Sequence, residues 1–269
     1  MSSTRPRSER PRKERREQAR AQRRALEQAQ RRRVARQRLL YRLGGALTVA
    51  LLVVIVLVAA SSGGEGRPGL QQGSQAARTD TGVSTLLRGI SQSGNVLGDP
   101  RAPVTMQYYG DLECPVCQAF SLGTLPRLID QQVRSGQLKI EYRSLQTATP
   151  SPATFLDQQV AAVAAGEQNR LWNYVELFYQ EQGQEGTGYV TDSYLRGLAT
   201  QVPGLNLAAW AAARGDRALA SQVTGSESAA SRAGLTATPA LVITGPQGTK
   251  YLSGDVPYAT VAAAVQSVA

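Results

Sequence analysis

An uninterrupted apolar run divides the chain into two parts of very different character. Residues 43–60 carry no charge, and Thr48 is the one polar side chain among them. A helix of this length is about 27 Å long, close to the roughly 30 Å of a membrane's hydrocarbon core. Tyr41 and Arg42 precede the run, where interfacial anchors belong. The run therefore predicts one transmembrane helix over 43–60.

A cleavable signal peptide is the alternative interpretation of this segment. The small residues that end the run, just before Ser61, resemble a cleavage site. However, the residues ahead of the run are far more numerous than in an ordinary signal peptide, and the apolar run is longer than usual. These two features favour an uncleaved anchor.

The charge of the chain is concentrated ahead of the apolar run. Residues 1–42 hold 16 of the 30 Lys and Arg but only 4 of the 20 Asp and Glu, so the remainder of the chain is close to neutral. We expect the segment to be a disordered basic tail. The positive-inside rule places it in the cytoplasm, with residues 61–269 outside the cell membrane. Nucleic-acid binding is a lesser alternative for the tail, and the charge of the folded part does not indicate it.

The outer part of the chain is predicted to consist of a linker and one domain. Residues 61–93 are rich in Gly, Ser and Gln, which predicts a flexible linker. Residues 94–269 have a usual domain size and an α/β pattern. The expected strands are 104–109, 138–143, 240–244 and 250–252, and the expected helices are 117–135, 155–165, 171–178, 194–201, 207–223 and 257–268.

The residues available for chemistry are few. The chain has no histidine, which excludes Ser-His-Asp and Cys-His catalysis and zinc sites that need histidine. It has two cysteines, both in the sequence Cys114-Pro115-Val116-Cys117, between an expected strand and an expected helix. We predict no metal and no cofactor.

The spacing of the two cysteines suits reversible disulfide chemistry. Residues three apart on the first turn of a helix bring their sulfurs within disulfide reach. Cys114 lies at the helix N-terminus, where unpaired N–H groups and the helix dipole stabilise a thiolate. We expect Cys114 to be the exposed nucleophile and Cys117, one turn inside, to resolve the mixed disulfide.

Two other interpretations of the cysteine pair are less consistent with the sequence. A structural disulfide that closes so short a loop would restrict the unfolded chain little. Half of a metal site shared between molecules would lack further Cys or His ligands on this chain. Both are less favoured than redox activity.

The sequence around the cysteines resembles a known family. The stretch from Ser93 to Thr105, which leads into Tyr109-Gly110-Asp111-Leu112-Glu113-Cys114-Pro115-Val116-Cys117, is similar to the DsbA-like thioredoxin-fold oxidoreductases, particularly membrane-anchored actinobacterial members. The stretch 234–243, which contains Thr238-Pro239, is the second part of the resemblance. The resemblance runs from about Gly94 to the C-terminus.

This resemblance implies an α/β thioredoxin fold with an inserted helical subdomain at about 150–232, preceded by the transmembrane helix. It implies that Pro239 is a cis-proline facing the cysteines and that Thr238 contacts the substrate backbone. Trp172 and Tyr174, within a sequence similar to a recurring helix of the subdomain, are expected to be core aromatics.

The implied activity is thiol–disulfide exchange with cysteine-containing secreted or membrane proteins, most readily as an oxidase recycled by a quinone-linked membrane partner. A reductase or isomerase, or a non-enzymatic binding domain of the same fold, is the alternative. The chain departs from strong oxidases of the family at Val116, where they often carry histidine, and Glu113 adds negative charge beside Cys114. Both departures predict a less oxidising potential.

Overall fold

The computed structural model describes residue 70 and residues 74–269. The predicted basic tail and the predicted transmembrane helix over 43–60 lie outside these residues. Within the described part, no helix is long and apolar enough to cross a membrane.

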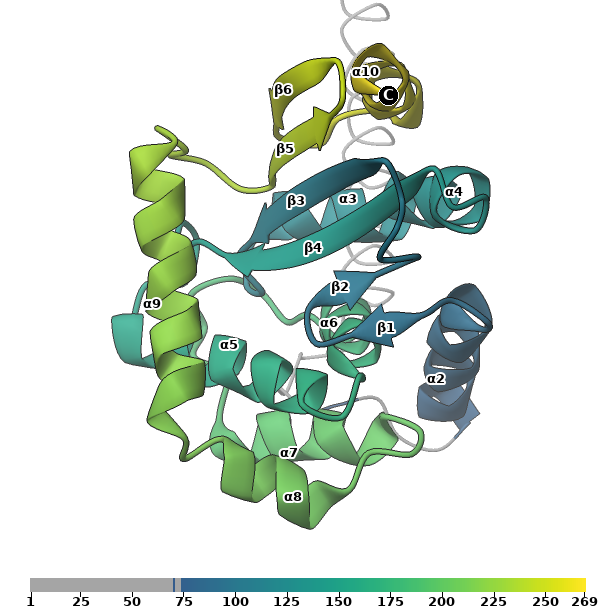
Figure 1. Ribbon diagram of the computed structural model, residues 1–269. Helices are drawn as coiled ribbons and strands as arrows, with labels where there is room; N and C mark the ends of the chain where they lie inside the picture. The colour runs from purple at the N-terminus through teal and green to yellow at the C-terminus, as the bar shows by residue number, and fades with distance from the viewer. Residues whose placement is uncertain (1–69, 71–73) are drawn as a thin grey trace, which may run out of the picture. The chain divides into compact units, whose positions relative to one another are not determined.

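A six-stranded mixed sheet forms the centre of the fold (Figure 1), with the strand order β1-β2-β4-β3-β5-β6. The central strands β3 and β4 are parallel, and the other neighbouring pairs are antiparallel. The strands are β1 (Gln92–Ser93), β2 (Val96–Leu97), β3 (Val104–Gly110), β4 (Leu138–Ser144), β5 (Ala240–Gly245) and β6 (Gly248–Ser253).

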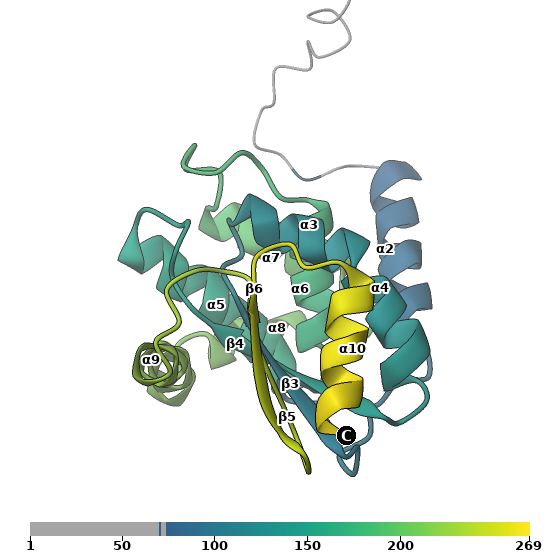
Figure 2. The same ribbon diagram turned by 90° about the horizontal axis from the view of Figure 1, so that it is seen from above.

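Helices surround the sheet and fill the long connection before β5. Figure 2 shows α9 and α10 on opposite sides of the strands. The helices are α2 (Ser74–Leu87), α3 (Pro115–Gly123), α4 (Leu125–Leu128), the π-helical turn η1 (Ile129–Val133), α5 (Pro152–Gly166), α6 (Leu171–Gln180), α7 (Asp192–Gln201), α8 (Leu207–Ala213), α9 (Arg217–Arg232) and α10 (Tyr258–Val268). The five helices α5 to α9 form the helical insertion predicted at about 150–232.

Three loops that are distant in sequence meet at one edge of the sheet. Because β3 and β4 are parallel and Gly110 lies opposite Ser144, the loops after both strands leave from the same edge. β5 runs antiparallel to β3, with Ala240 opposite Tyr109, so the loop before β5 arrives at that edge too. This topology brings the Cys114 turn, the loop after β4 and the Thr238–Pro239 segment together.

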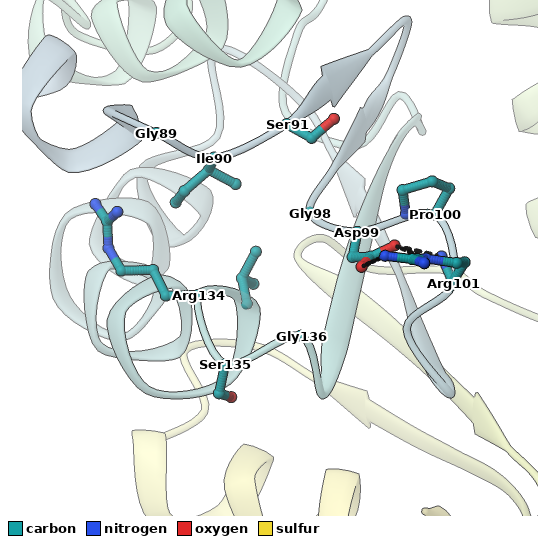
Figure 3. A pocket seen from close by; sticks show the side chains of 11 residues that line it. Gly89, Ile90, Ser91, Gly98, Asp99, Pro100, Arg101, Arg134, Ser135 and Gly136 are labelled. Carbon is teal, nitrogen blue, oxygen red and sulfur yellow. Dashed lines mark hydrogen bonds and ion pairs between the residues drawn. The ribbon is translucent and has the colours of Figure 1, made fainter.

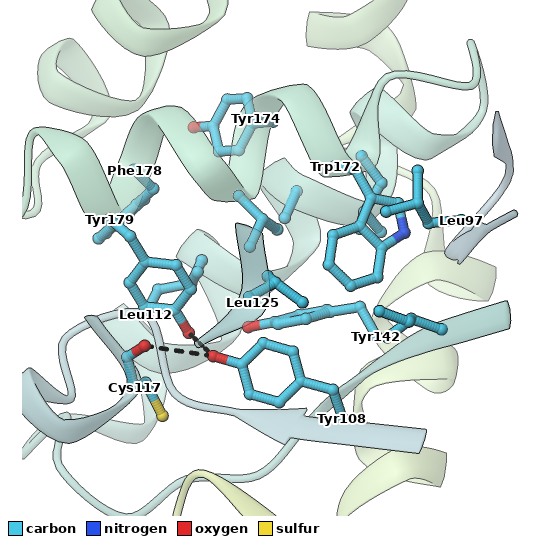
Figure 4. Close-up of a cluster of buried hydrophobic side chains, with 14 of the residues drawn as sticks. Leu97, Tyr108, Leu112, Cys117, Leu125, Tyr142, Trp172, Tyr174, Phe178 and Tyr179 are labelled. Atoms are coloured by element: carbon cyan, nitrogen blue, oxygen red, sulfur yellow. Dashed lines mark hydrogen bonds between the residues drawn. The ribbon is translucent and has the colours of Figure 1, made fainter. Parts of the chain in front are cut away.

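A cluster of aromatic side chains fills the core beneath this edge (Figure 4). Tyr108 on β3 packs against Tyr142 on β4 and against Phe120 on α3, with ring centroids 5.6 and 5.2 Å apart. Trp172 and Tyr174 on α6 have no exposed surface, as expected of core aromatics. The Trp172 indole N–H donates to the Asn95 carbonyl at 3.1 Å, which attaches the insertion to the β1–β2 hairpin.

The linker prediction for 61–93 is wrong over its second half. Helix α2 occupies 74–87, and the hairpin β1–β2 begins at Gln92. Val83 and Leu87, four residues apart, are buried, and the Arg134 guanidinium donates to the carbonyl of Leu86. Two apolar residues one turn apart are a weak sequence signal for a helix. The residue that holds the end of α2, Arg134, lies 48 positions beyond Leu86 in the sequence.

Two helices expected to be continuous are broken. The helix expected over 117–135 stops at Gly123 and resumes at Leu125, because Pro126 has no N–H to donate to the preceding turn. The helix expected over 207–223 is divided at Gly215, and a new helix starts where the Asp216 carboxylate accepts from Ala218 N.

Candidate functional site

Cys114 and Cys117 occupy the first turn of α3, directly after the turn that leaves β3. Cys114 is the N-cap residue with extended backbone, and Pro115 begins the helix, where a missing N–H costs nothing. Cys114 N donates to the Asp111 carbonyl at 3.1 Å, which closes the turn. Both cysteines are free thiols.

The two cysteine residues differ in exposed surface less than expected. Cys117 has no exposed surface, but Cys114 is only 6% exposed, so the prediction of an exposed nucleophile is wrong. The Thr238 carbonyl lies 3.6 Å from the Cys114 Sγ, and the Gln182 amide donates to the Cys114 carbonyl at 3.2 Å. These two segments cover Cys114, whereas Val116 between the cysteines is 41% exposed.

The two thiols have opposite acidities. A hydrogen bond from the Cys117 thiol is the main cause that lowers the pKa of Cys114 to about 6. The Thr238 side chain and the backbone N–H groups of Cys117 and Val116 lower it further, against the effect of burial. For Cys117, burial raises the pKa well above its usual value. Cys114 therefore ionises first, as its place at the helix start predicts.

Glu113 is not among the groups that shift the pKa of Cys114 most. The residue is buried, and burial raises the pKa of its carboxyl. Its side chain interacts with the Thr149 side chain and with the Gly186 backbone. The interactions that shift the Cys114 pKa most come from Cys117 and Thr238.

The Thr238–Pro239 segment faces the cysteines. The peptide bond between these residues is cis, and Thr238 is buried. The Thr238 hydroxyl forms a hydrogen bond with the hydroxyl of Thr147, from the loop after β4. The structure thus brings together Cys114, Cys117, Thr238 and Pro239, although their chemical roles stay predictions.

Two further residues at the site have no counterpart in the sequence interpretation. Asp111 is fully buried directly ahead of the cysteine turn, and Gln182 reaches back from the end of α6 to donate to Leu112 O at 2.7 Å. For Asp111 a signal exists, since an acidic residue that follows a buried strand is expected at a turn. For Gln182 no local pattern marks a residue whose partners are about seventy positions away.

Two tyrosine hydroxyls, those of Tyr108 and Tyr179, lie beside the Cys117 carbonyl (Figure 4). The Tyr108 hydroxyl is 3.5 Å from the Cys117 carbonyl and 3.3 Å from the Tyr179 hydroxyl, which in turn donates to the Asp111 carbonyl. Burial raises the pKa of Tyr108 and Tyr179, so both remain neutral donors. The floor of the site is therefore polar but uncharged.

A cavity of 740 Å³ lies away from the cysteines (Figure 3). Ile90, Val133, Arg134 and the Asp99–Arg101 ion pair line its wall. It contains no thiol, and no group of three or more potential metal ligands occurs among the described residues.

Known proteins resemble this chain in sequence over part of its length and resemble it in fold. The family model described as Thioredoxin matches residues 91–265. The probable disulfide bond formation protein D of Bacillus anthracis is 26% identical over 111 residues, which are 39% of this chain and 48% of that protein. The disulfide bond formation protein D of Bacillus subtilis is 26% identical over 109 residues, 39% of this chain and 46% of that protein. The chain spans about half the length of these curated relatives.

Solved structures extend the likeness to almost the whole of their chains. Oxidised BdbD from Bacillus subtilis matches with a TM-score of 0.57 at 19% identity, over 66% of this chain and 95% of that chain. DsbA2 from Pseudomonas aeruginosa matches with a TM-score of 0.53 at 24% identity, over 66% and 96%. α-DsbA1 from Wolbachia pipientis gives 0.55 at 18%, over 68% and 92%. At these identities the structures show the fold alone.

Proposed function

The chain belongs to the thioredoxin family and has the DsbA-like fold that its sequence predicted, and from this premise we propose that it is a thiol–disulfide oxidoreductase. One observation carries the proposal. A cysteine with a pKa of about 6 lies beside a buried cysteine with a raised pKa, and the Thr238 carbonyl lies 3.6 Å from the Sγ of the first, Cys114. A structural disulfide needs no such difference in acidity between its two thiols.

The proposed reaction transfers two electrons and two protons. A substrate thiolate attacks the Cys114 sulfur of the Cys114–Cys117 disulfide, which forms a mixed disulfide and releases Cys117. A second substrate thiolate then attacks the substrate sulfur of that mixed disulfide and releases the Cys114 thiolate. The substrate gains a disulfide and loses two hydrogens, and the cysteine pair becomes a dithiol. In the opposite direction Cys114 attacks a substrate disulfide and Cys117 resolves the intermediate.

Oxidation of substrates is the direction that the site favours. A low-pKa thiolate is a good leaving group and stabilises the reduced form, which makes the disulfide form a stronger oxidant. The names of the curated relatives, disulfide bond formation proteins, support this direction. A reductase or isomerase would need a supply of electrons that keeps the pair reduced.

The proposal includes a place and partners for this reaction. We propose a single-pass protein with its N-terminus in the cytoplasm and the described domain outside the membrane. The charge asymmetry and the apolar run over 43–60 support it. Its substrates would be cysteine-containing secreted or membrane proteins, and a quinone-linked membrane oxidase would return the pair to the disulfide form.

A matched pair of variants tests the activity. With purified protein, a reduced dicysteine peptide and glutathione disulfide, Cys114→Ser should abolish peptide oxidation. In the opposite direction, when mixed with the oxidised peptide, Cys117→Ser should instead accumulate a mixed disulfide between Cys114 and the peptide, because the thiol that resolves it in the unaltered protein is absent. Each variant is the control for the other, since each removes one sulfur. Equal trapping by both variants, or no peptide oxidation by the unaltered protein, would overturn the proposal.

The topology has a separate test. Protease added to intact, wall-stripped cells should degrade the described domain and spare an epitope placed in residues 1–42. Protection of the domain would reject the orientation, and a mature N-terminus near Ser61 would show a cleaved signal peptide instead.

A further inference from the structure

Asp111 is a fully buried carboxylate with an unusual number of donors. Its Oδ2 accepts from three successive backbone N–H groups, those of Thr147, Ala148 and Thr149, at 2.9, 2.8 and 2.9 Å. Its Oδ1 accepts from Glu113 N at 3.2 Å, from the Gln158 amide at 3.3 Å and from the Thr149 hydroxyl. Both oxygens are saturated, and burial without such partners would be strongly unfavourable.

Apart from Gln158 on α5, these donors come from two different loops. Glu113 belongs to the turn that carries Cys114, whereas Thr147, Ala148 and Thr149 belong to the loop after β4. The carboxylate therefore joins the cysteine turn to the neighbouring loop, at the edge where parallel β3 and β4 both end. The Asp111 carbonyl adds a second connection, since it accepts from Cys114 N and from the Tyr179 hydroxyl.

The loop that Asp111 holds reaches the nucleophile by a second route. The Thr147 hydroxyl forms a hydrogen bond with the Thr238 hydroxyl, and the Thr238 carbonyl lies 3.6 Å from the Cys114 Sγ. The contacts thus form a closed ring from Asp111 through Thr147 and Thr238 to Cys114 and back to Asp111. The links through Thr147 and Thr238 join different loops, whereas the last link, from Cys114 N to the Asp111 carbonyl, lies within the cysteine turn.

We propose that Asp111 is the positioning residue of the site, which holds the Thr238–Pro239 segment against Cys114 through the loop at Thr147. The inference rests on the proposed function, because it concerns the reactivity of Cys114 in disulfide exchange. Asp111 touches no reacting atom in this arrangement. It acts by fixing where Thr238 lies, and the Thr238 side chain is one of the groups that lower the pKa of Cys114.

Asp111→Asn tests the role by replacing a single heavy atom, one carboxylate oxygen, with an amide nitrogen. An amide has one accepting atom, so either three backbone N–H groups or the three donors at Oδ1 must face an NH₂ group. If Asp111 positions the loop, the pKa of Cys114 should rise by about one unit. At about pH 6 the thiolate fraction would then fall roughly fivefold, as would the rate of alkylation. Thiolate absorbance during a pH titration of the full-length protein gives the pKa directly.

The sign of the shift separates positioning from a simple charge effect. If Asp111 acted only as a nearby negative charge, its removal would lower the pKa of Cys114. If it had only a structural role, the variant would unfold more easily with the pKa of Cys114 unchanged. Either result overturns the proposal.

Two variants complete the design. Glu176→Gln is the matched control, because it also converts a buried carboxyl to an amide, yet Glu176 accepts from the Ser121 hydroxyl on α3 and not from a loop of the ring. It should leave the pKa of Cys114 unchanged. Thr147→Val keeps the backbone donor and removes only the hydroxyl of an exposed residue, so it should reproduce the rise even if Asp111→Asn fails to fold.

The double variant Asp111→Asn/Thr147→Val should raise the pKa no more than the larger single effect, because both act through one route. Additive shifts would contradict that route. The proposed function fails by a different result, namely that the unaltered protein does not oxidise the dicysteine peptide. In that case the titration of Cys114 still tests the role of Asp111, because it does not depend on peptide oxidation.

Discussion

The Cys114 thiolate should make the reduced protein gain stability over the oxidised protein as the pH rises from acidic to neutral. The hydrogen bond from Cys117 and the other donors lower the pKa of Cys114 from 9.0 to about 6. A thiol whose pKa is lower in the folded than in the unfolded state stabilises the fold fully above the unfolded pKa. That contribution is lost as the pH falls through the folded pKa. In the oxidised protein neither sulfur titrates, so the term is missing.

The magnitude follows from the two pKa values. Linkage between a folded pKa of about 6 and an unfolded pKa of 9.0 gives about 1.4 kcal/mol at pH 7 and almost nothing below about pH 5. Solvent screening at the mouth of the site reduces the value, so we expect about 1 kcal/mol at pH 7. Cys117, with its raised pKa, remains a thiol over this range and adds nothing.

Denaturant unfolding of both redox forms between about pH 5 and pH 8 measures this term. The free energy of unfolding of the oxidised form is subtracted from that of the reduced form at each pH. The subtraction removes the carboxyls with raised pKa values, Glu113, Glu176 and Glu227, which titrate in both forms. Cys114→Ser is the control and should show none of the rise seen in the reduced protein. A difference that stays constant with pH would refute the reasoning.

Three further predictions concern neighbours of the pair. We expect the reduction potential of the unaltered protein to lie between about −120 and about −270 mV. Val116→His should raise this potential, because an imidazolium stabilises the Cys114 thiolate. Equilibration with glutathione buffers measures the potential, and an unchanged value would show that more distant groups dominate. Pro239→Ala should slow the release of bound substrate, which rapid acid quenching would detect as longer-lived mixed disulfides. Mixed-disulfide lifetimes equal to those of the unaltered protein would contradict a substrate-binding role for Pro239. Glu176→Gln should gain about 2 to 3 kcal/mol of stability over the unaltered protein between about pH 5 and pH 7, because burial raises the pKa of Glu176 to about 8 and folding therefore opposes its ionisation. Equal pH profiles in denaturant unfolding would contradict this.

Much of the fold was predictable because its signals are local. The alternation of Leu138, Ile140 and Tyr142 marks β4, and the structure buries all three. The length of chain between β4 and β5 indicated the helical insertion, and five helices fill it. Helix α2 was missed because its stability comes from tertiary contacts. Its C-terminal end is held by Arg134, a residue that lies in another element of the fold.

The site was predictable in its residues and less so in its environment. The Cys114–Cys117 spacing and the helix start gave the order of ionisation that the structure supports. The degree of cover over Cys114 was not foreseeable, since the covering Thr238 lies 124 residues away along the chain. The role of Asp111 depends equally on which loops the sheet brings together, and no single segment shows that.

Glu113 shows why neighbours in sequence are poor guides to the acidity of Cys114. Peptide neighbours at a turn point in different directions, and the Glu113 side chain turns toward Thr149 and Gly186. Groups that approach the sulfur in space, the Cys117 thiol one turn along α3 and the Thr238 side chain from the loop before β5, set its pKa instead. The acidity of Cys114 is consequently a property of the loop arrangement. Substitutions that move the loop at Thr147 or Thr238 should therefore change the chemistry more than a change of charge at Glu113, even though Glu113 is the adjacent residue.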